Sequence, residues 1–327
     1  VDWRRATFGF NSLEHNEVRL YAGCWKGQRG KFWLDGLRIE EVGLVNVLRR
    51  PGARIVVTSG ETIYKEGKDF ARIEDPKLNF RFDHDGPPIR ILPGGRIREG
   101  QRLRVHYYHG MAIGRGQVSV CMSEPKLYEI WQKQVELIQK HLAPTHWLLS
   151  MDEIRMGGSC WACEKPREMI FNPPNEKGML TLADEPVRRL TMAEILGGCI
   201  TRQFQMIRKA NPRAEVAIWS DMLDPNHNAH ANYYLVEGDF TGSWRHVPKE
   251  LIVATWYFRK RRASLDHFSK LGFRTLAGAY YDGDTLDNPK GWLDDLDTTP
   301  KAVGIMYTTW RNKYALLAPF GDLVSKR

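Results

Sequence analysis

The chain has 327 residues, 42% of them hydrophobic, so it exceeds one average domain and is long enough to bury a sizeable core. No apolar run reaches the ~18 residues that a membrane-spanning helix needs, so we expect no membrane partner. The net charge is +9, but the basic residues are scattered and form no long tract or nucleic-acid motif. We therefore expect no nucleic-acid partner, and an anionic glycan stays open as an alternative. The N-terminus has neither an initiator Met nor a signal-peptide pattern, which predicts that the chain is part of a longer polypeptide.

The first 108 residues are predicted to be rich in strands. Residues 17–21 and 31–35 alternate polar and apolar side chains around a glycine turn, and they resemble the closing strands of jelly-roll carbohydrate-binding modules. We therefore expect a partial jelly roll over 1–42 and a small β-rich, sandwich-like domain or insertion over 43–108. The strands expected in this second segment are 54–58, 62–64, 89–92 and 102–108.

After about residue 109 the pattern changes to apolar strands that alternate with helical segments, which is typical of an α/β architecture. We expect residues 109–327 to form a (β/α)8 TIM-type barrel, complete or incomplete. Helices are predicted at 125–141, 191–210 and 264–271, and strands at 118–122, 147–151, 215–219, 251–256, 273–281 and 301–310. Thr191 with Glu194 three residues later forms a capping box, which marks the start of the second helix.

Five of these strands end in carboxylates or aromatic residues. The residues in question are Asp152, Glu153, Trp219, Asp221, Trp256, Tyr280, Tyr281, Asp282 and Trp310. In a parallel barrel the carboxyl ends of the strands meet on one face, and that face carries the active site. Core packing would scatter the aromatic residues along the strands instead, so the pattern predicts one shared site.

The ordered series resembles the second half of the barrel of family 20 glycoside hydrolases, the β-N-acetylhexosaminidases. The resemblance covers about residues 110–315. It implies that Glu153 is the general acid, that Asp152 orients a 2-acetamido group, and that Tyr281 or Tyr280 binds the acetamido oxygen. Three further residues would form apolar walls: Trp219, Trp256 and Trp310. It also implies an oligo- or polysaccharide substrate and a secreted or extracytoplasmic location.

The sequence departs from that family at two points. Ser150 and Met151 stand where the family has Gly-Gly before the acidic pair, and the arginine that grips the sugar hydroxyls has no visible counterpart. Two alternatives therefore stay open. The first is a retaining glycosidase in which Glu153 and Asp282 lie ~5–5.5 Å apart. The second is a non-catalytic glycan-binding protein.

The remaining candidates have weaker signals. Asp221 either caps a loop or binds a sugar hydroxyl, and Arg155 either forms a salt bridge or contacts the ligand. The five cysteines are an odd number, which argues against a complete disulfide framework. Cys160 and Cys163 form one CxxC motif, which favours a local disulfide or two packed thiols, because a zinc site needs two more ligands. We expect no metal and no cofactor.

Overall fold

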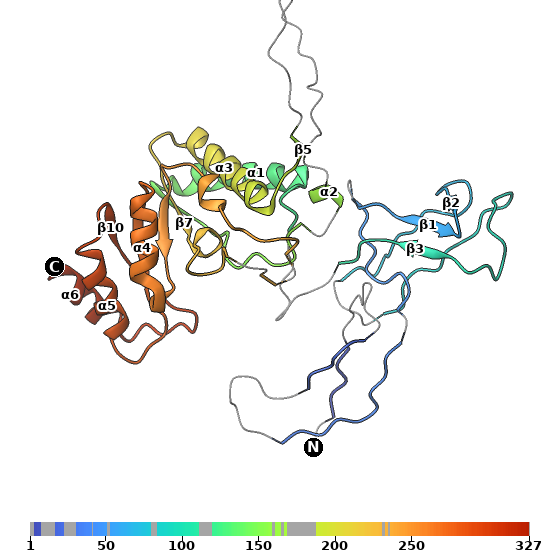
Figure 1. Cartoon of the computed structure of the whole chain (residues 1–327), viewed down its shortest axis with the longest axis horizontal. Helices are drawn as coiled ribbons and strands as arrows, with labels where there is room; N and C mark the ends of the chain where they lie inside the picture. Colours follow the sequence, from blue (N-terminus) through green and yellow to red (C-terminus); the bar gives the residue numbers. More distant parts are fainter. Residues whose placement is uncertain are drawn as a thin grey trace, which may run out of the picture. The chain divides into compact units, whose positions relative to one another are not determined.

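The structure is a computed structural model that describes most of the chain. The described residues are 3–7, 17–22, 31–40, 42–50, 53–79, 84–110, 120–158, 161–164, 167–168, 188–230, 233–234 and 236–326. The chain divides into two compact units, Val1–Val118 and Ser119–Arg327. Each unit is described by itself below (Figure 1). The expected three-part division at residues 42 and 108 stays a prediction.

The first unit contains one small antiparallel sheet with the strand order β2-β1-β3. Its strands are β1 (Val56–Ser59), β2 (Thr62–Tyr64) and β3 (Arg104–His106). Val57 on the central strand pairs with Tyr64 on one side and Val105 on the other, and its side chain is buried. A small apolar core forms around Val57 and Phe70, so this sheet covers a core on one side only.

A buried carboxylate ties the loops of the first unit together. Asp69 is fully buried and accepts hydrogen bonds from the backbone N–H groups of Lys65, at 2.7 Å, and of Arg96, at 3.0 Å. The Arg96 guanidinium also donates to both carboxylate oxygens, at 3.0 and 2.6 Å. The Arg96 side chain and the Lys65 backbone outweigh burial and hold the pKa of Asp69 well below its usual range.

The predicted sandwich-like front is wrong. Within the described part of the first 42 residues there is no strand, and residues 17–22 and 31–40 are irregular and largely exposed. Trp33 is 60% exposed and Leu37 is 79% exposed. The alternation of polar and apolar residues shows only which side chains would lie on the same face of a strand. A strand also needs a neighbouring strand that forms hydrogen bonds with its backbone N–H and C=O groups. No such neighbour is present among the described residues.

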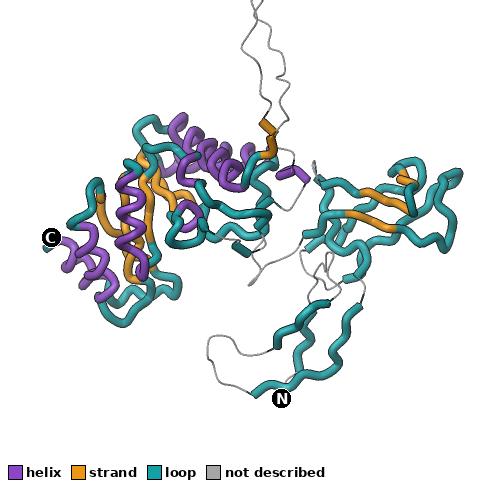
Figure 2. The backbone as a smooth tube through the Cα atoms, in the orientation of Figure 1, coloured by secondary structure: helices purple, strands orange, loops and turns teal. Residues whose placement is uncertain are grey.

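The second unit is built on a curled, parallel, five-stranded sheet with the order β10-β9-β8-β7-β4 (Figures 1 and 2). Its strands are β4 (His146–Leu149), β7 (Glu215–Trp219), β8 (Ile252–Thr255), β9 (Arg274–Tyr280) and β10 (Ala302–Thr308). Adjacent strands are in register, with Ile218 opposite Val253 and Val253 opposite Thr275. All five carboxyl ends therefore lie at one edge of the sheet.

The expected complete (β/α)8 barrel is wrong. The described residues form half a barrel, in which β4 and β10 are edge strands. Residues 120–122, which we predicted as part of a strand, lie in a loop. In the described part of the segments before residue 125, strands and helices do not alternate. Residues 56–106 instead make an antiparallel sheet.

Helices pack on the parallel sheet and on one another. They are α1 (Pro125–Leu142), α2 (Trp161–Glu164), α3 (Met192–Ala210), α4 (Arg261–Lys270), α5 (Asp287–Leu296) and α6 (Leu317–Ser325). The predicted capping box at the start of α3 is confirmed, because the Thr191 side chain accepts from the Glu194 N–H while the Glu194 carboxylate accepts from the Thr191 N–H. None of the described helices is long and apolar enough to cross a membrane.

Several short elements complete the second unit. They are the two-stranded pair β5 (Arg167–Glu168) and β6 (Arg188–Arg189) and the 3₁₀ turns η1 (Asp221–Leu223), η2 (Ser243–Arg245) and η3 (Phe258–Lys260). The turn η1 directly follows β7, and it takes the chain across the carboxyl edge of the sheet. Its first residue, Asp221, lies behind the site described next.

Candidate functional site

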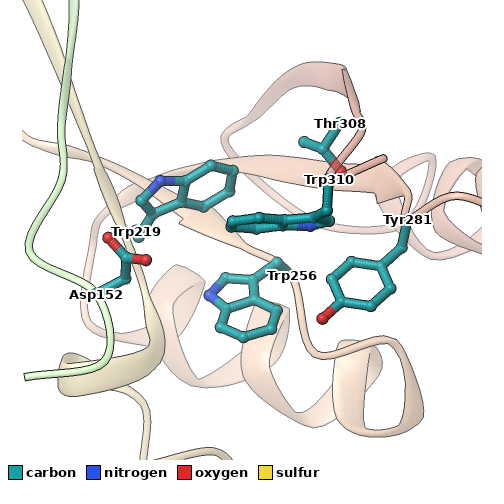
Figure 3. A pocket seen from close by; sticks show the side chains of 6 residues that line it. All are labelled: Asp152, Trp219, Trp256, Tyr281, Thr308 and Trp310. Atoms are coloured by element: carbon teal, nitrogen blue, oxygen red, sulfur yellow. The ribbon is translucent and has the colours of Figure 1, made fainter. Parts of the chain in front are cut away.

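A small hollow lies at the carboxyl edge of the parallel sheet. Figure 3 shows the six residues that line it: Asp152, Trp219, Trp256, Tyr281, Thr308 and Trp310. Each of the five strands contributes at least one of them, either as its last residues or just beyond its end. All of the predicted aromatic residues except Tyr280 therefore meet in one place with one predicted carboxylate, Asp152. Because the strands are parallel and in register, their ends bring together residues that lie far apart in the sequence.

A glycine in β9 makes room for two of the aromatic rings. A Cβ atom on Gly278 would lie 2.7 Å from Cζ3 of Trp219 and 3.3 Å from Cβ of Trp256. Contacts of ordinary length between carbon atoms are about 3.5–4.0 Å, so a side chain at this position would displace the Trp219 ring. Gly278 therefore lets the indole of Trp219 lie against the β9 backbone.

Three of the aromatic side chains that line the hollow contact one another in a row, from Trp256 through Tyr281 to Trp310. Trp256 and Tyr281 are nearly parallel, with ring centroids 6.2 Å apart and an interplanar angle of 15°. The Tyr281 ring meets Trp310 at 6.1 Å and 62°. Tyr281 is 53% exposed and Trp310 is 60% exposed, so they form the rim, whereas Trp219 and Trp256 are half-buried (Figure 3).

The enclosed part of the hollow is small. The volume open to the centre of a water molecule is about 10 Å³, which is close to the space that one water needs. A methyl group or a single water therefore fits into the enclosed part, whereas a larger ring would rest on the exposed faces of Tyr281 and Trp310.

The two neighbouring carboxylates of the acidic pair point in different directions. Asp152 lines the hollow, and its Oδ1 accepts a hydrogen bond of 3.0 Å from the Ser150 hydroxyl. Glu153 is not one of the described lining residues. Its Oε2 lies 2.9 Å from the Arg155 guanidinium, and the Arg155 guanidinium in turn lies 4.9 Å from the centre of the Tyr234 ring. The structure thus places Arg155 beside Glu153 rather than in the hollow.

Glu153 is nevertheless close to the rim. Burial raises the pKa of Tyr281, and the charges of Glu153 and Asp282 raise it further. Burial and the Glu153 charge likewise raise the pKa of Tyr233. The Glu153 carboxylate therefore lies within electrostatic range of both tyrosines.

Asp221 lies behind the acidic pair and does not line the hollow. It is fully buried, and its Oδ2 accepts hydrogen bonds from the Glu153 N–H at 2.8 Å and from Asn228 Nδ2 at 3.1 Å. Burial raises the pKa of Asp221 to about 7, and the charge of Asp152 also raises it, against the lowering effect of these hydrogen bonds. Asp221 was predicted either to cap a loop or to bind a sugar hydroxyl. In the structure its side chain accepts hydrogen bonds from the loops around it.

Asp282 connects the ends of two strands. Its Oδ1 accepts a hydrogen bond from the Thr309 hydroxyl, and its Oδ2 accepts one of 2.8 Å from the Trp310 N–H. Burial alone would raise the pKa of Asp282, but the Thr309 hydroxyl and the Trp310 backbone outweigh it, and the pKa falls below its ordinary value. Asp282 thus fixes the loop that carries Trp310.

Tyr280 and Tyr281 lie in different surroundings. Tyr280 is buried and stacks on Tyr307, with centroids 4.2 Å apart, whereas Tyr281 lines the hollow. Tyr280, Tyr281 and Asp282 have φ angles of 82°, 54° and 59°, all in the left-handed region. Each such residue costs roughly 1–2 kcal/mol. This turn separates the two tyrosines, and it leaves Tyr281 as the one that can meet a ligand in the hollow.

Sequence reasoning missed several residues of the site. Thr308 lines the hollow, and His227 supports it from behind, because its ring packs edge-on against Trp256 at 4.4 Å and stacks on Tyr257 at 4.5 Å. Burial, with the nearby His230, lowers the pKa of His227 to about 4, so this ring is neutral at physiological pH. Thr308 is the last residue of β10, and Tyr257 follows two residues after the end of β8. Their places at strand ends could have indicated from the sequence that they belong near the site.

The described residues do not form a metal site. No group of three or more His, Cys, Asp or Glu side chains among them could hold a metal ion. The sulfurs of Cys121 and Cys163 lie 3.5 Å apart, which is longer than the ~2.05 Å of a disulfide bond. Cys160, the other half of the CxxC motif, lies outside the described residues.

Comparisons with known proteins give no relative. No protein-family model matches the chain, and no curated protein matches it either. The function is therefore inferred from the geometry of the hollow alone.

Proposed function

We propose that this protein is a hexosaminidase-like glycoside hydrolase that acts on a glycan ending in a 2-acetamido sugar. One observation carries this proposal: Asp152, Trp219, Trp256, Tyr281 and Trp310 meet in one hollow, although they come from five different strand ends. Aromatic side chains with one carboxylate beside them suit a sugar ligand. The apolar faces of a sugar ring stack on aromatic rings, and its polar groups bond to the carboxylate.

The size and chemistry of the hollow favour an acetamido group. Its enclosed part accepts a methyl-sized group, and Asp152, which lines it, can accept a hydrogen bond from an amide N–H. The Tyr281 hydroxyl can donate a hydrogen bond to the acetamido oxygen. The sugar ring itself would rest on Trp310, whose exposed face is large enough to stack on it.

Glu153 would act as the general acid. The acetamido oxygen of the substrate attacks the anomeric carbon, the glycosidic bond breaks, and the Glu153 proton moves to the leaving oxygen. Water then attacks the anomeric carbon and opens the cyclic intermediate, while the Glu153 carboxylate takes up one proton from that water. This cycle requires Glu153 to leave the 2.9 Å contact with Arg155 and turn toward the hollow.

The second candidate is a non-catalytic glycan-binding protein. The Glu153–Arg155 contact favours it, because a carboxylate held by a guanidinium is not placed against a ligand in the hollow. The retaining pair of Glu153 and Asp282 has less support. Both carboxylate oxygens of Asp282 accept hydrogen bonds from the loop after β10, so this side chain is engaged in holding the fold.

Turnover of 4-nitrophenyl glycosides tests the proposal. The panel includes the N-acetylglucosaminide, the N-acetylgalactosaminide and the matching sugars without an acetamido group. We expect turnover of the acetamido sugars only, and a loss of about 10²–10⁴-fold in kcat for Glu153→Gln. Glu250→Gln, an exposed glutamate in the same unit, is the control and should keep full activity.

The outcomes separate the candidates. Unchanged turnover in Glu153→Gln would remove Glu153 from the mechanism. Equal turnover of sugars with and without the acetamido group would favour the pair of Glu153 and Asp282. Quenching of tryptophan fluorescence by N-acetylglucosamine without any turnover would favour the glycan-binding protein.

A further inference from the structure

The acidic turn after β4 is held in place from another part of the chain. The N–H of Glu153 donates to Asp221 Oδ2 at 2.8 Å, and the N–H of Ile154 donates to Met222 Sδ at 3.1 Å. Both acceptors lie in η1, 68 residues further along the sequence. Two consecutive backbone N–H groups of the acidic turn therefore bond to two consecutive side chains of one 3₁₀ turn.

The Asp221 side chain is itself fixed. It is fully buried, and Asn228 Nδ2 donates to its Oδ2 at 3.1 Å, while the Asn228 backbone N–H donates to the Asp221 backbone carbonyl oxygen at 3.1 Å. The Trp256 indole lies beside the same carboxyl and, as a side-chain hydrogen-bond partner, lowers its pKa. A fully buried carboxyl is costly unless it is hydrogen-bonded, and these partners hold it behind the acidic turn.

The backbone of Glu153 needs such an anchor. Its φ angle is 47°, in the left-handed region that residues other than glycine rarely adopt. A conformation of this kind persists only where its surroundings hold it. Here it is the conformation in which Asp152 lines the hollow while Glu153 lies beside Arg155.

We propose that Asp221 is a positioning residue: its buried carboxyl holds the Glu153 backbone in the left-handed conformation that directs Asp152 into the hollow. The effect on a reaction rests on the proposed function, whereas the effect on the backbone does not. Asp221 acts only through the acidic turn, because it does not itself line the hollow.

The charges that face Asp221 connect this role to pH. The Asp152 carboxylate faces it from the turn after β4, and Tyr233 faces it from the segment that follows Asn228 and His230, while Glu153 contributes its backbone N–H and Asn228 and Trp256 are uncharged. Below pH 7 a protonated Asp221 adds no charge beside Asp152. Above pH 7 its ionised form repels Asp152, and we expect the turn to loosen.

Amide hydrogen exchange at Glu153 tests the positioning role without any substrate. We expect exchange about tenfold faster or more in Asp221→Ala, because the acceptor is lost. Exchange should stay near the wild-type rate in Asp221→Asn, whose amide oxygen can still accept. Asp224→Asn is the control, because Asp224 is also buried but bonds the Asn226 N–H of its own loop, at 2.8 Å.

Turnover provides the second measurement where the wild type is active. Asp221→Ala should lower kcat at least tenfold, and Asp221→Asn should retain activity below pH 7 and lack the decline that we expect of the wild type above pH 7. If Asp221→Ala does not fold, Asp221→Ser replaces it, because its shorter side chain cannot reach the Glu153 amide. Wild-type exchange at Glu153 in a folded variant without the acceptor would overturn the proposal. A wild type without turnover would count against the proposed hydrolase, while the exchange result would still decide the role of Asp221.

Discussion

Gly278→Ala is the sharpest probe of the hollow, because it adds one methyl group at the point where β9 meets the Trp219 ring. The new Cβ would lie 2.7 Å from Cζ3 of Trp219, at least about 0.7 Å inside an ordinary carbon–carbon contact. The rigid indole must therefore shift. The free space beside it is the hollow, so we expect the ring to move into that space and fill it.

The cost follows from over-packing. Inserting a methyl group into a well-packed site typically costs about 1–3 kcal/mol. For a unit of this size, each kcal/mol lowers the melting temperature by roughly 2–4 °C, so we expect a decrease of about 2–12 °C. Binding of N-acetylglucosamine should weaken at least tenfold, since the enclosed part of the hollow has room for only about one water.

Thermal melts and tryptophan fluorescence titrations measure both effects, and Gly198→Ala is the matched control. Gly198 lies on the exposed side of α3, and a Cβ there meets nothing within 4 Å. That substitution should stabilise the protein by about 0.5–1 kcal/mol, because alanine favours a helix over glycine. The reasoning is refuted if Gly278→Ala melts like the wild type and binds the sugar equally well.

Three further predictions concern stability. Burial raises the folded-state pKa of Asp221 to about 7 from an ordinary value of 3.8. Its contribution to stability is therefore complete below pH 4 and is lost as the pH rises toward 7. Across this interval Asp221→Asn should gain stability relative to the wild type, on the order of 4 kcal/mol at most, in urea titrations at several pH values. Thr191→Ala removes the capping box with Glu194 and should cost about 1 kcal/mol by the same titrations, and an unchanged midpoint would show that the cap is not needed. The lowered pKa of Asp69 means that its ionised form, bonded to Arg96, stabilises the first unit above pH 4. Asp69→Asn should therefore destabilise this unit at pH 7. The difference in stability between variant and wild type should shrink as the pH falls below 4. A difference that persists at low pH in circular-dichroism melts would contradict that account.

Local sequence signals predicted several elements of the second unit, but the helices α5 and α6 were not among them. The helix that begins after Thr191 ends at Ala210 as expected. Its capping box, its amphipathic pattern and its end are all local features of about 20 consecutive residues, so the sequence alone is enough to predict it. The strand Glu215–Trp219 matches its apolar run residue by residue. Placing aromatic and acidic residues at strand ends needed only these boundaries and the parallel order. Five of the six residues that line the hollow were predicted in this way, and Thr308 was not.

The sequence by itself thus determined which residues gather at the carboxyl edge of the sheet. Only the tertiary structure decided that the sheet stays half a barrel, and that residues 17–22 and 31–40 form no strands, because strand pairing depends on which distant segments meet. It also decided that Asp152 lines the hollow while Glu153 meets Arg155. These different directions of Asp152 and Glu153 depend on the positive φ angle of Glu153 and on the hydrogen bond from its N–H to Asp221, which lies 68 residues away in the sequence. A local sequence pattern indicates neither of these two features.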